Sequence, residues 1–169
     1  MRACLERHFQ NNLGTNVFLS GHFIEGDFNG DGSQDLAVDG LTTTLTPGTE
    51  NTVLPNCTFV DLRPMIESQP GQKSLPNKDR PAVVGVIHGE GPIGWRSQNA
   101  KDTHWFWVHP VNSIEAQSSV RVFNFIESAR SLKLKGDVVR LGMLSGQAGF
   151  AYYNGTSYEW HPVPNTTSP

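Results

Sequence analysis

The 169 residues are 37% hydrophobic and carry a formal net charge of −3. This length suits one domain with its own core and is far too short for a seven-bladed propeller. A slightly negative chain offers no broad basic field to nucleic acid or anionic lipid, and no apolar run approaches the roughly 20 residues of a membrane span. We therefore expect a single globular domain over residues 1–164 and a frayed tail over residues 165–169.

The N-terminal segment has a helical pattern. Apolar residues recur at helical spacing from Cys4 to Leu13, and Gly14 would end the helix. The spacing predicts a helix over residues 3–12. The first residues lead directly into polar sequence, so we expect no signal peptide in this chain.

An acidic loop follows, between strands expected over residues 18–25 and 36–41. Calcium is a hard cation that takes roughly six to eight oxygen ligands, and closely spaced carboxylates and amides suit it. Without an ion, three carboxylates within nine residues would repel one another. Gly30 and Gly32 supply the backbone turns. The pattern predicts a hairpin that holds calcium, and the alternative is a solvated turn without metal. The oxygen-bearing side chains of the loop are Asp27, Asn29, Asp31 and Asp35.

The loop is not of the EF-hand type, because that pattern requires a Glu at its twelfth position, where this chain has Val38. The stretch Gly-Asp-Phe-Asn-Gly-Asp-Gly instead resembles the calcium loop of FG-GAP repeats, as found in integrin propellers and bacterial VCBS-type proteins. The Phe-Gly and Gly-Ala-Pro segments of those repeats are missing, and the likeness covers residues 26–38 only. The resemblance implies side-chain ligands from Asp27, Asn29, Asp31 and Asp35, and a main-chain carbonyl ligand from Ser33.

The chain has two cysteines, Cys4 and Cys57, which allow one intramolecular disulfide or two free thiols. A disulfide requires an oxidising compartment. Calcium is scarce in the cytosol and abundant outside it, where even weak sites stay loaded. We therefore favour the bridge and a periplasmic or secreted location.

The middle of the chain alternates between loops and strands. Residues 42–56 are rich in Thr, Pro and Gly and are expected to form a loop. A short strand is expected over residues 57–62, and a helical turn near residues 64–68 within a long loop. The continuous apolar run of residues 81–87 predicts the central strand.

A glycine-rich turn follows over residues 88–95. His88 and Glu90 are acid–base candidates there, but we favour a tight chain reversal as the reason for the glycines, since no nucleophile accompanies the pair. Residues 103–109 alternate with aromatic side chains on both faces, which predicts a strand covered on both sides. Trp105 and Trp107 are either core residues, which we favour, or the lining of a carbohydrate or peptide groove. The candidate binding surface comprises His88, Glu90, Trp95, Trp105 and Trp107.

The C-terminal part is expected to form a turn over residues 112–118, a helix over residues 122–131 and three strands. These strands span residues 137–144, 149–153 and 157–161, and Asn154-Gly155 is a strong two-residue hairpin signal between the last two. This region resembles the endings of small bacterial exported proteins that carry one Asp-Phe-Asn-Gly-Asp-Gly motif. The resemblance implies an envelope location, and some such proteins act as inhibitors or immunity partners of toxins.

The sequence thus predicts an α+β fold, mainly an antiparallel sheet with an N-terminal helix and one calcium-loop hairpin. It favours a calcium-stabilised extracytoplasmic binding or inhibitor/immunity-type module that acts on a protein partner. The alternative is a cell-envelope hydrolase that uses the metal or the pair His88 and Glu90.

Overall fold

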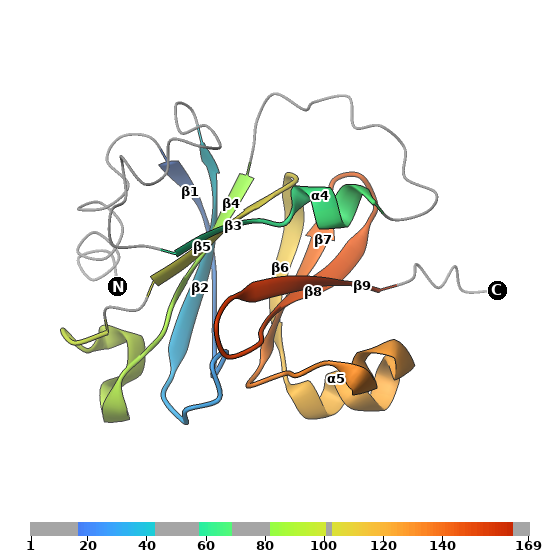
Figure 1. The fold of residues 1–169 in the computed structure, drawn as a ribbon. Coiled ribbons are helices and arrows are strands. Elements are labelled where there is room, and N and C mark those ends of the chain that lie inside the picture. Colours follow the sequence, from blue (N-terminus) through green and yellow to red (C-terminus); the bar gives the residue numbers. More distant parts are fainter. Residues whose placement is uncertain (1–16, 43–57, 69–81, 101–102, 164–169) are drawn as a thin grey trace.

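The computed structural model describes residues 17–42, 58–68, 82–100 and 103–163. Strands make up 50% of these residues and helices 20%. The strands form two sheets that pack against each other, with short helices at their margins (Figure 1). The fold is therefore mainly β.

The first sheet has five strands in the order β1-β2-β4-β5-β3. All neighbours are antiparallel except β3 and β5, which are parallel. The central strand β4 is buried along its whole length, as the continuous apolar run predicts for a strand that is covered on both faces. The bounds are β1 (Val17–Gly26), β2 (Asp35–Thr42), β3 (Thr58–Asp61), β4 (Ala82–Ile87) and β5 (Thr103–Val108).

The second sheet is an antiparallel meander of four strands in the order β6-β7-β8-β9. Its last hairpin turns over residues 154–157, where the Asn154 N–H donates to the Ser157 carbonyl at 3.1 Å and Gly155 has φ +106°. Glycine tolerates a positive φ better than other residues do. The hairpin is confirmed, but its loop spans residues 154–157 and not Asn154-Gly155 alone. The bounds are β6 (Val111–Gln117), β7 (Val138–Met143), β8 (Ala148–Tyr153) and β9 (Tyr158–Val163).

The described helices are short. The longest, α5 (Ser119–Phe125), has seven residues and begins where the Ser118 side chain accepts a hydrogen bond from the Arg121 N–H. Together with η4 (Glu127–Ser131) it covers part of the outer face of the second sheet, with Val122 and Ala129 packed near Phe150. The other two are α4 (Arg63–Glu67) and η3 (Gly91–Arg96).

The main core lies between the two sheets. Val84 and Phe106 of the first sheet belong to one buried cluster with Val139 and Leu141 of the second. A separate cluster on the other face of the first sheet contains all three tryptophans of residues 95–107. Because β5 contributes to both clusters, both of its faces are covered, as its alternating aromatic pattern predicts.

The structure corrects the α+β prediction. The helix predicted over residues 122–131 is broken at Ile126, whose extended backbone (φ −123°, ψ 95°) separates α5 from η4. Residues 112–118, predicted as a turn, form most of the edge strand β6, in which Ile114 packs on the core between the sheets and polar neighbours face solvent. The predicted N-terminal helix, Cys4, Cys57 and the tail after residue 164 lie outside the described residues.

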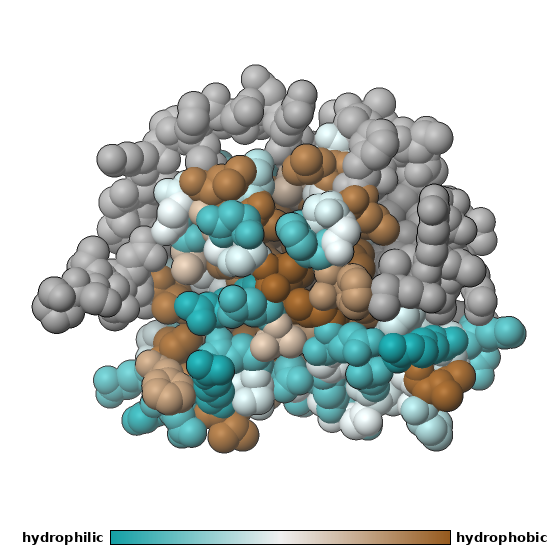
Figure 2. Space-filling model, turned by 180° about the vertical axis from the view of Figure 1, so that it is seen from behind, coloured by the Kyte–Doolittle hydropathy of each residue, from teal (hydrophilic) through white to brown (hydrophobic). Residues whose placement is uncertain are grey.

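Among the described helices, none is both long and apolar enough to cross a membrane. On the face shown in Figure 2, hydrophobic residues gather in the middle, above a largely hydrophilic lower part. Single exposed hydrophobic residues are normal on a protein surface, whereas a contiguous exposed hydrophobic patch marks a contact site. The large hydrophobic side chains exposed in the described part of the chain are Leu19, Phe23, Leu41, Met65, Ile93, Val120, Phe125 and Leu144.

Candidate metal centre

The acidic loop joins β1 to β2, which pair in antiparallel register from Gly26 and Asp35 outward. Its backbone wraps around the carboxylate of Asp27, which accepts hydrogen bonds from three N–H groups, those of Gly30 (2.8 Å), Asp31 (3.1 Å) and Gly32 (3.0 Å). Gly30 and Gly32 have φ of +76° and +84°, so the two glycines of the motif make the turns that this wrapping requires.

The middle of the loop is ordered by Asn29 and Asp31. The Asn29 amide donates to Asp31 Oδ2 at 2.9 Å, and the Ser33 N–H donates to Asp31 Oδ1 at 2.7 Å. Burial raises the pKa of Asp31, but these hydrogen bonds outweigh it and hold the pKa below its ordinary value. Asp31 is therefore a carboxylate anion at neutral pH.

Asp35 closes the loop and is fully buried. Its Oδ2 accepts from the N–H groups of Phe28 (2.7 Å) and Asn29 (3.2 Å), and its Oδ1 accepts from the N–H of Gly89 (2.6 Å). Burial raises the pKa of Asp35 to about 7, although the same hydrogen bonds act to lower it. A cation beside this carboxylate would favour its charged form.

The segment around η3 contacts one side of the loop. The Trp95 N–H donates to the Gln34 carbonyl at 2.7 Å, and the Gly91 N–H donates to Ser33 Oγ at 3.1 Å. Arg96 donates to the Gln34 side chain and lies 4.2 Å above the Trp95 ring. The glycine-rich turn thus packs on the acidic loop.

The segment that leads into β7 contacts the loop as well. The Asp137 N–H donates to the Asp27 carbonyl at 2.7 Å, and the Asp27 N–H donates to Asp137 Oδ2 at 3.1 Å. The approach is so close that a Cβ on Gly30 would lie 1.8 Å from the Lys135 carbonyl oxygen. Since β7 belongs to the second sheet, the acidic loop links the two sheets.

The donor set can be tested against calcium by counting the acceptor sites that remain. A carboxylate has about four such sites. Backbone N–H groups occupy three acceptor sites on Asp27 and three on Asp35. Two acceptor sites on Asp31 are occupied. Each of the three carboxylates therefore keeps at least one acceptor site for a cation. Asn29 Oδ1 accepts one hydrogen bond, from the Asp31 N–H at 3.1 Å. With the Ser33 carbonyl, these oxygens fit a calcium ion chemically.

This set includes an amide and a main-chain carbonyl. Within the part of the chain that the structure describes, no group of three or more His, Cys, Asp or Glu side chains is arranged to hold a metal ion. A cation here would depend on Asn29 and Ser33 in addition to the carboxylates. Such mixed oxygen ligation is typical of calcium.

Most of the candidate binding surface is buried, and Trp105 and Trp107 are core residues, the alternative that the sequence favoured. Trp95, Trp105 and Trp107 are each only 1% exposed. Trp105 lies so close over β4 that a Cβ on Gly85 would be 2.5 Å from its ring, which shows why the tryptophans fill the core instead of reaching solvent. His88 is also buried, and of the five residues only Glu90 is exposed.

The structure also reveals a buried cluster that the sequence did not indicate. His88 Nε2 lies 3.0 Å from the Tyr158 hydroxyl, and the ring centroids of His88 and His104 are 4.6 Å apart. Tyr153 packs edge-on against both histidines. The alternation of β5 predicts that His104 lies on the same face as Phe106. The sequence does not show that this face packs against β8 and β9, which supply Tyr153 and Tyr158.

Comparison with protein-family models, with curated proteins and with solved structures gives no match to this chain.

Proposed function

We propose that residues 27–35 bind one structural calcium ion and that the domain is an extracytoplasmic binding or inhibitor/immunity-type module. The observation that carries the proposal is the position of the loop, which contacts β1, β2, the segment after β4 and the segment before β7. An ion there would stabilise the junction of the two sheets. The ligands would be Asp27, Asn29, Asp31, Asp35 and the Ser33 carbonyl.

A structural role is favoured over a catalytic one by how the carboxylates are held. Asp27 and Asp35 each accept three hydrogen bonds from backbone N–H groups, and Asp35 is fully buried. A catalytic ion needs an open coordination position beside a cleft.

The alternative of a cell-envelope hydrolase has weaker support. His88 is 3% exposed and lies against Tyr158, whereas Glu90 is exposed to solvent. Loss of a measured turnover in Glu90→Gln, at an unchanged melting temperature, would favour this alternative.

The proposal includes a periplasmic or secreted location and a Cys4–Cys57 disulfide. Both follow from the calcium loop, since calcium is abundant in oxidising compartments. A bridge over this sequence separation would stabilise the fold by about 3–4 kcal/mol in the chain-entropy model. Mass spectrometry of alkylated, non-reduced protein from its native compartment tests it, and two alkylated thiols would contradict it.

The calcium proposal is tested by thermal unfolding with calcium and with chelator. An ion that binds only the folded state stabilises it by about 2.7 kcal/mol at a hundredfold excess over Kd. We expect calcium to raise the melting temperature of the wild type and of Glu90→Gln, which alters an exposed acid outside the ligand set. Asp31→Ala should not respond. Equal melting temperatures of the wild type in calcium and in chelator would contradict the proposal.

A further inference from the structure

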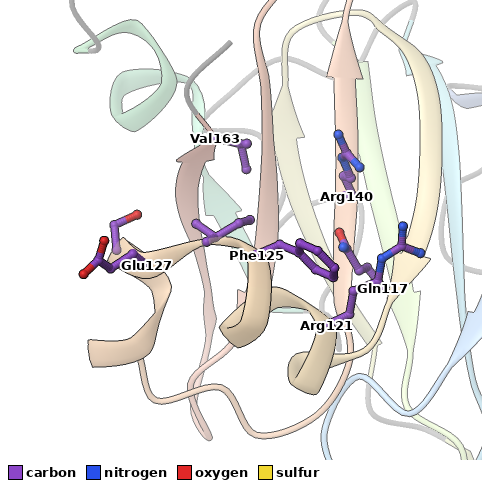
Figure 3. A pocket seen from close by; sticks show the side chains of 8 residues that line it. Gln117, Arg121, Phe125, Glu127, Arg140 and Val163 are labelled. Carbon is purple, nitrogen blue, oxygen red and sulfur yellow. The ribbon is translucent and has the colours of Figure 1, made fainter. Parts of the chain in front are cut away.

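A groove of about 470 Å³ lies between the α5–η4 cover and the outer face of the second sheet (Figure 3). Its lining comes from α5, η4, β6, β7 and β9. Val139 and Leu141 of β7 point into the core between the sheets, so Arg140 between them points outward into the groove.

The most exposed large hydrophobic side chain of the described residues lies in this groove. Phe125, at the end of α5, is 79% exposed. Its ring points toward the side chains of Gln117 and Arg121 (Figure 3). Leaving an aromatic side chain in water forgoes roughly 1.5–3 kcal/mol of burial energy, which a partner can recover.

Two arginines, Arg121 and Arg140, line the groove together with Phe125. Neither the Arg121 nor the Arg140 guanidinium has a hydrogen bond or ion pair to any described residue. Glu115 is opposite Arg140 in the β6–β7 ladder, but no ion pair joins them in the structure. Glu127 lines the far end of the groove and points away from the arginines (Figure 3). The groove lining thus has two arginines and one glutamate, which gives it a net positive charge.

We propose that this groove docks a protein segment that carries a carboxylate beside an apolar side chain. A guanidinium binds a carboxylate with two parallel hydrogen bonds, and an aromatic ring next to it accepts the apolar neighbour. Aromatic residues and arginines are also the residues that most often dominate binding energy at protein interfaces. Nucleic acid fits poorly, because two arginines on a chain of net charge −3 supply few phosphate contacts.

This inference rests on the proposed binding role and names its site and partner chemistry, but it does not require calcium in the loop. It is tested by titrating ¹⁵N-labelled, calcium-loaded protein with the capped tripeptide acetyl-Glu-Phe-Glu-amide. The matched probes are acetyl-Gln-Phe-Gln-amide and inorganic phosphate. We expect saturable shifts of the Arg121 and Arg140 Nε–Hε signals with the acidic peptide, and weaker effects with both other probes.

The variants make the test specific. Arg140→Gln and Phe125→Ala should each weaken binding of the acidic peptide roughly tenfold. The control for Arg140→Gln is Lys133→Gln, which removes an exposed cation outside the groove. The control for Phe125→Ala is Leu144→Ala, which truncates an exposed apolar side chain outside the groove. Both controls should bind the peptide as the wild type does.

Three results would overturn the inference: no binding of the acidic peptide, equal binding of the neutral peptide, or the same shifts with phosphate alone. The calcium-dependent melting shift is measured on the same samples. Loss of that shift contradicts the proposed calcium site and leaves the peptide result to be judged separately.

Discussion

The acidic loop of residues 27–35 and the groove beside α5 differ in what their charged groups contact. In the loop, the carboxylates of Asp27 and Asp35 are bonded to backbone N–H groups from within the loop and from Gly89. In the groove, the guanidinium groups of Arg121 and Arg140 have no such partner among the described residues. The first arrangement stabilises the fold, and the second leaves binding capacity for another molecule.

The two regions therefore predict opposite responses to mutation. Removing a hydrogen-bonded buried carboxylate leaves its N–H donors buried without an acceptor, which costs their full desolvation free energy. Removing a solvent-exposed side chain leaves the folded state nearly unchanged, because its surroundings are similar in the unfolded chain.

The largest effect is expected for Gly30→Ala. The new methyl group would lie 1.8 Å from the Lys135 carbonyl oxygen, so the loop and the segment before β7 would have to separate. Gly32→Ala is the matched control, since its φ is also positive but nothing lies within 4 Å of a Cβ there. We expect about 1–2 kcal/mol of destabilisation for Gly32→Ala and more than about 3 kcal/mol for Gly30→Ala in urea unfolding. Equal losses would show that the close approach does not constrain the fold.

Asp35→Ala is expected to have the next largest effect. It leaves the N–H groups of Phe28, Asn29 and Gly89 without their acceptor in a buried site. A loss of about 3 kcal/mol is expected, measured in chelator so that calcium does not contribute. A loss below about 1 kcal/mol would mean that water or the backbone replaces the carboxylate.

A smaller effect is expected from protonation of His161, which accepts or donates a hydrogen bond with Ser128 at 2.9 Å on the edge of the groove. Burial lowers the pKa of His161 in the folded state, so the unfolded chain binds the proton more readily. Its contribution to stability is present above about pH 6.5 and is lost as the pH falls below that value. The melting temperature should fall less between pH 8 and pH 5.5 in His161→Gln than in the wild type, and an identical fall would contradict this.

The smallest effect is expected in the groove. Phe125→Ser and Arg121→Gln alter exposed side chains and should change the free energy of unfolding by less than about 0.5 kcal/mol. Urea unfolding measures this. A loss above about 1 kcal/mol would show that these side chains stabilise the helical cover, and the contrast between the two regions would weaken.

The sequence predicted the features that depend on nearby residues. The continuous apolar run of residues 81–87 identified β4, and Asn154-Gly155 identified the last hairpin, because each is a local pattern with one favourable backbone solution. The candidate ligands of the acidic loop could be identified for the same reason, since they lie within nine residues.

Features that depend on pairing between distant segments were not predicted. Two hydrogen bonds of the acidic loop join residues far apart in the sequence. Gly89 bonds to Asp35, 54 residues away, and Asp137 bonds to Asp27, 110 residues away. The aromatic alternation favoured burial of Trp105 and Trp107, which the structure confirms, but it did not show which segment covers them. That Arg121 and Arg140 have no partner among the described residues depends on where α5 ends. Such contacts are set by the tertiary packing of apolar faces, and local periodicity does not contain them.

The central claim is that the acidic loop binds one calcium ion. Isothermal titration of chelator-stripped protein with calcium tests it most directly. We predict one site per chain in the wild type and in Glu90→Gln, and no binding heat in an Asp31→Ala variant whose circular dichroism spectrum is unchanged. Absence of calcium binding to the folded wild type, or undiminished binding to Asp31→Ala, would contradict the account.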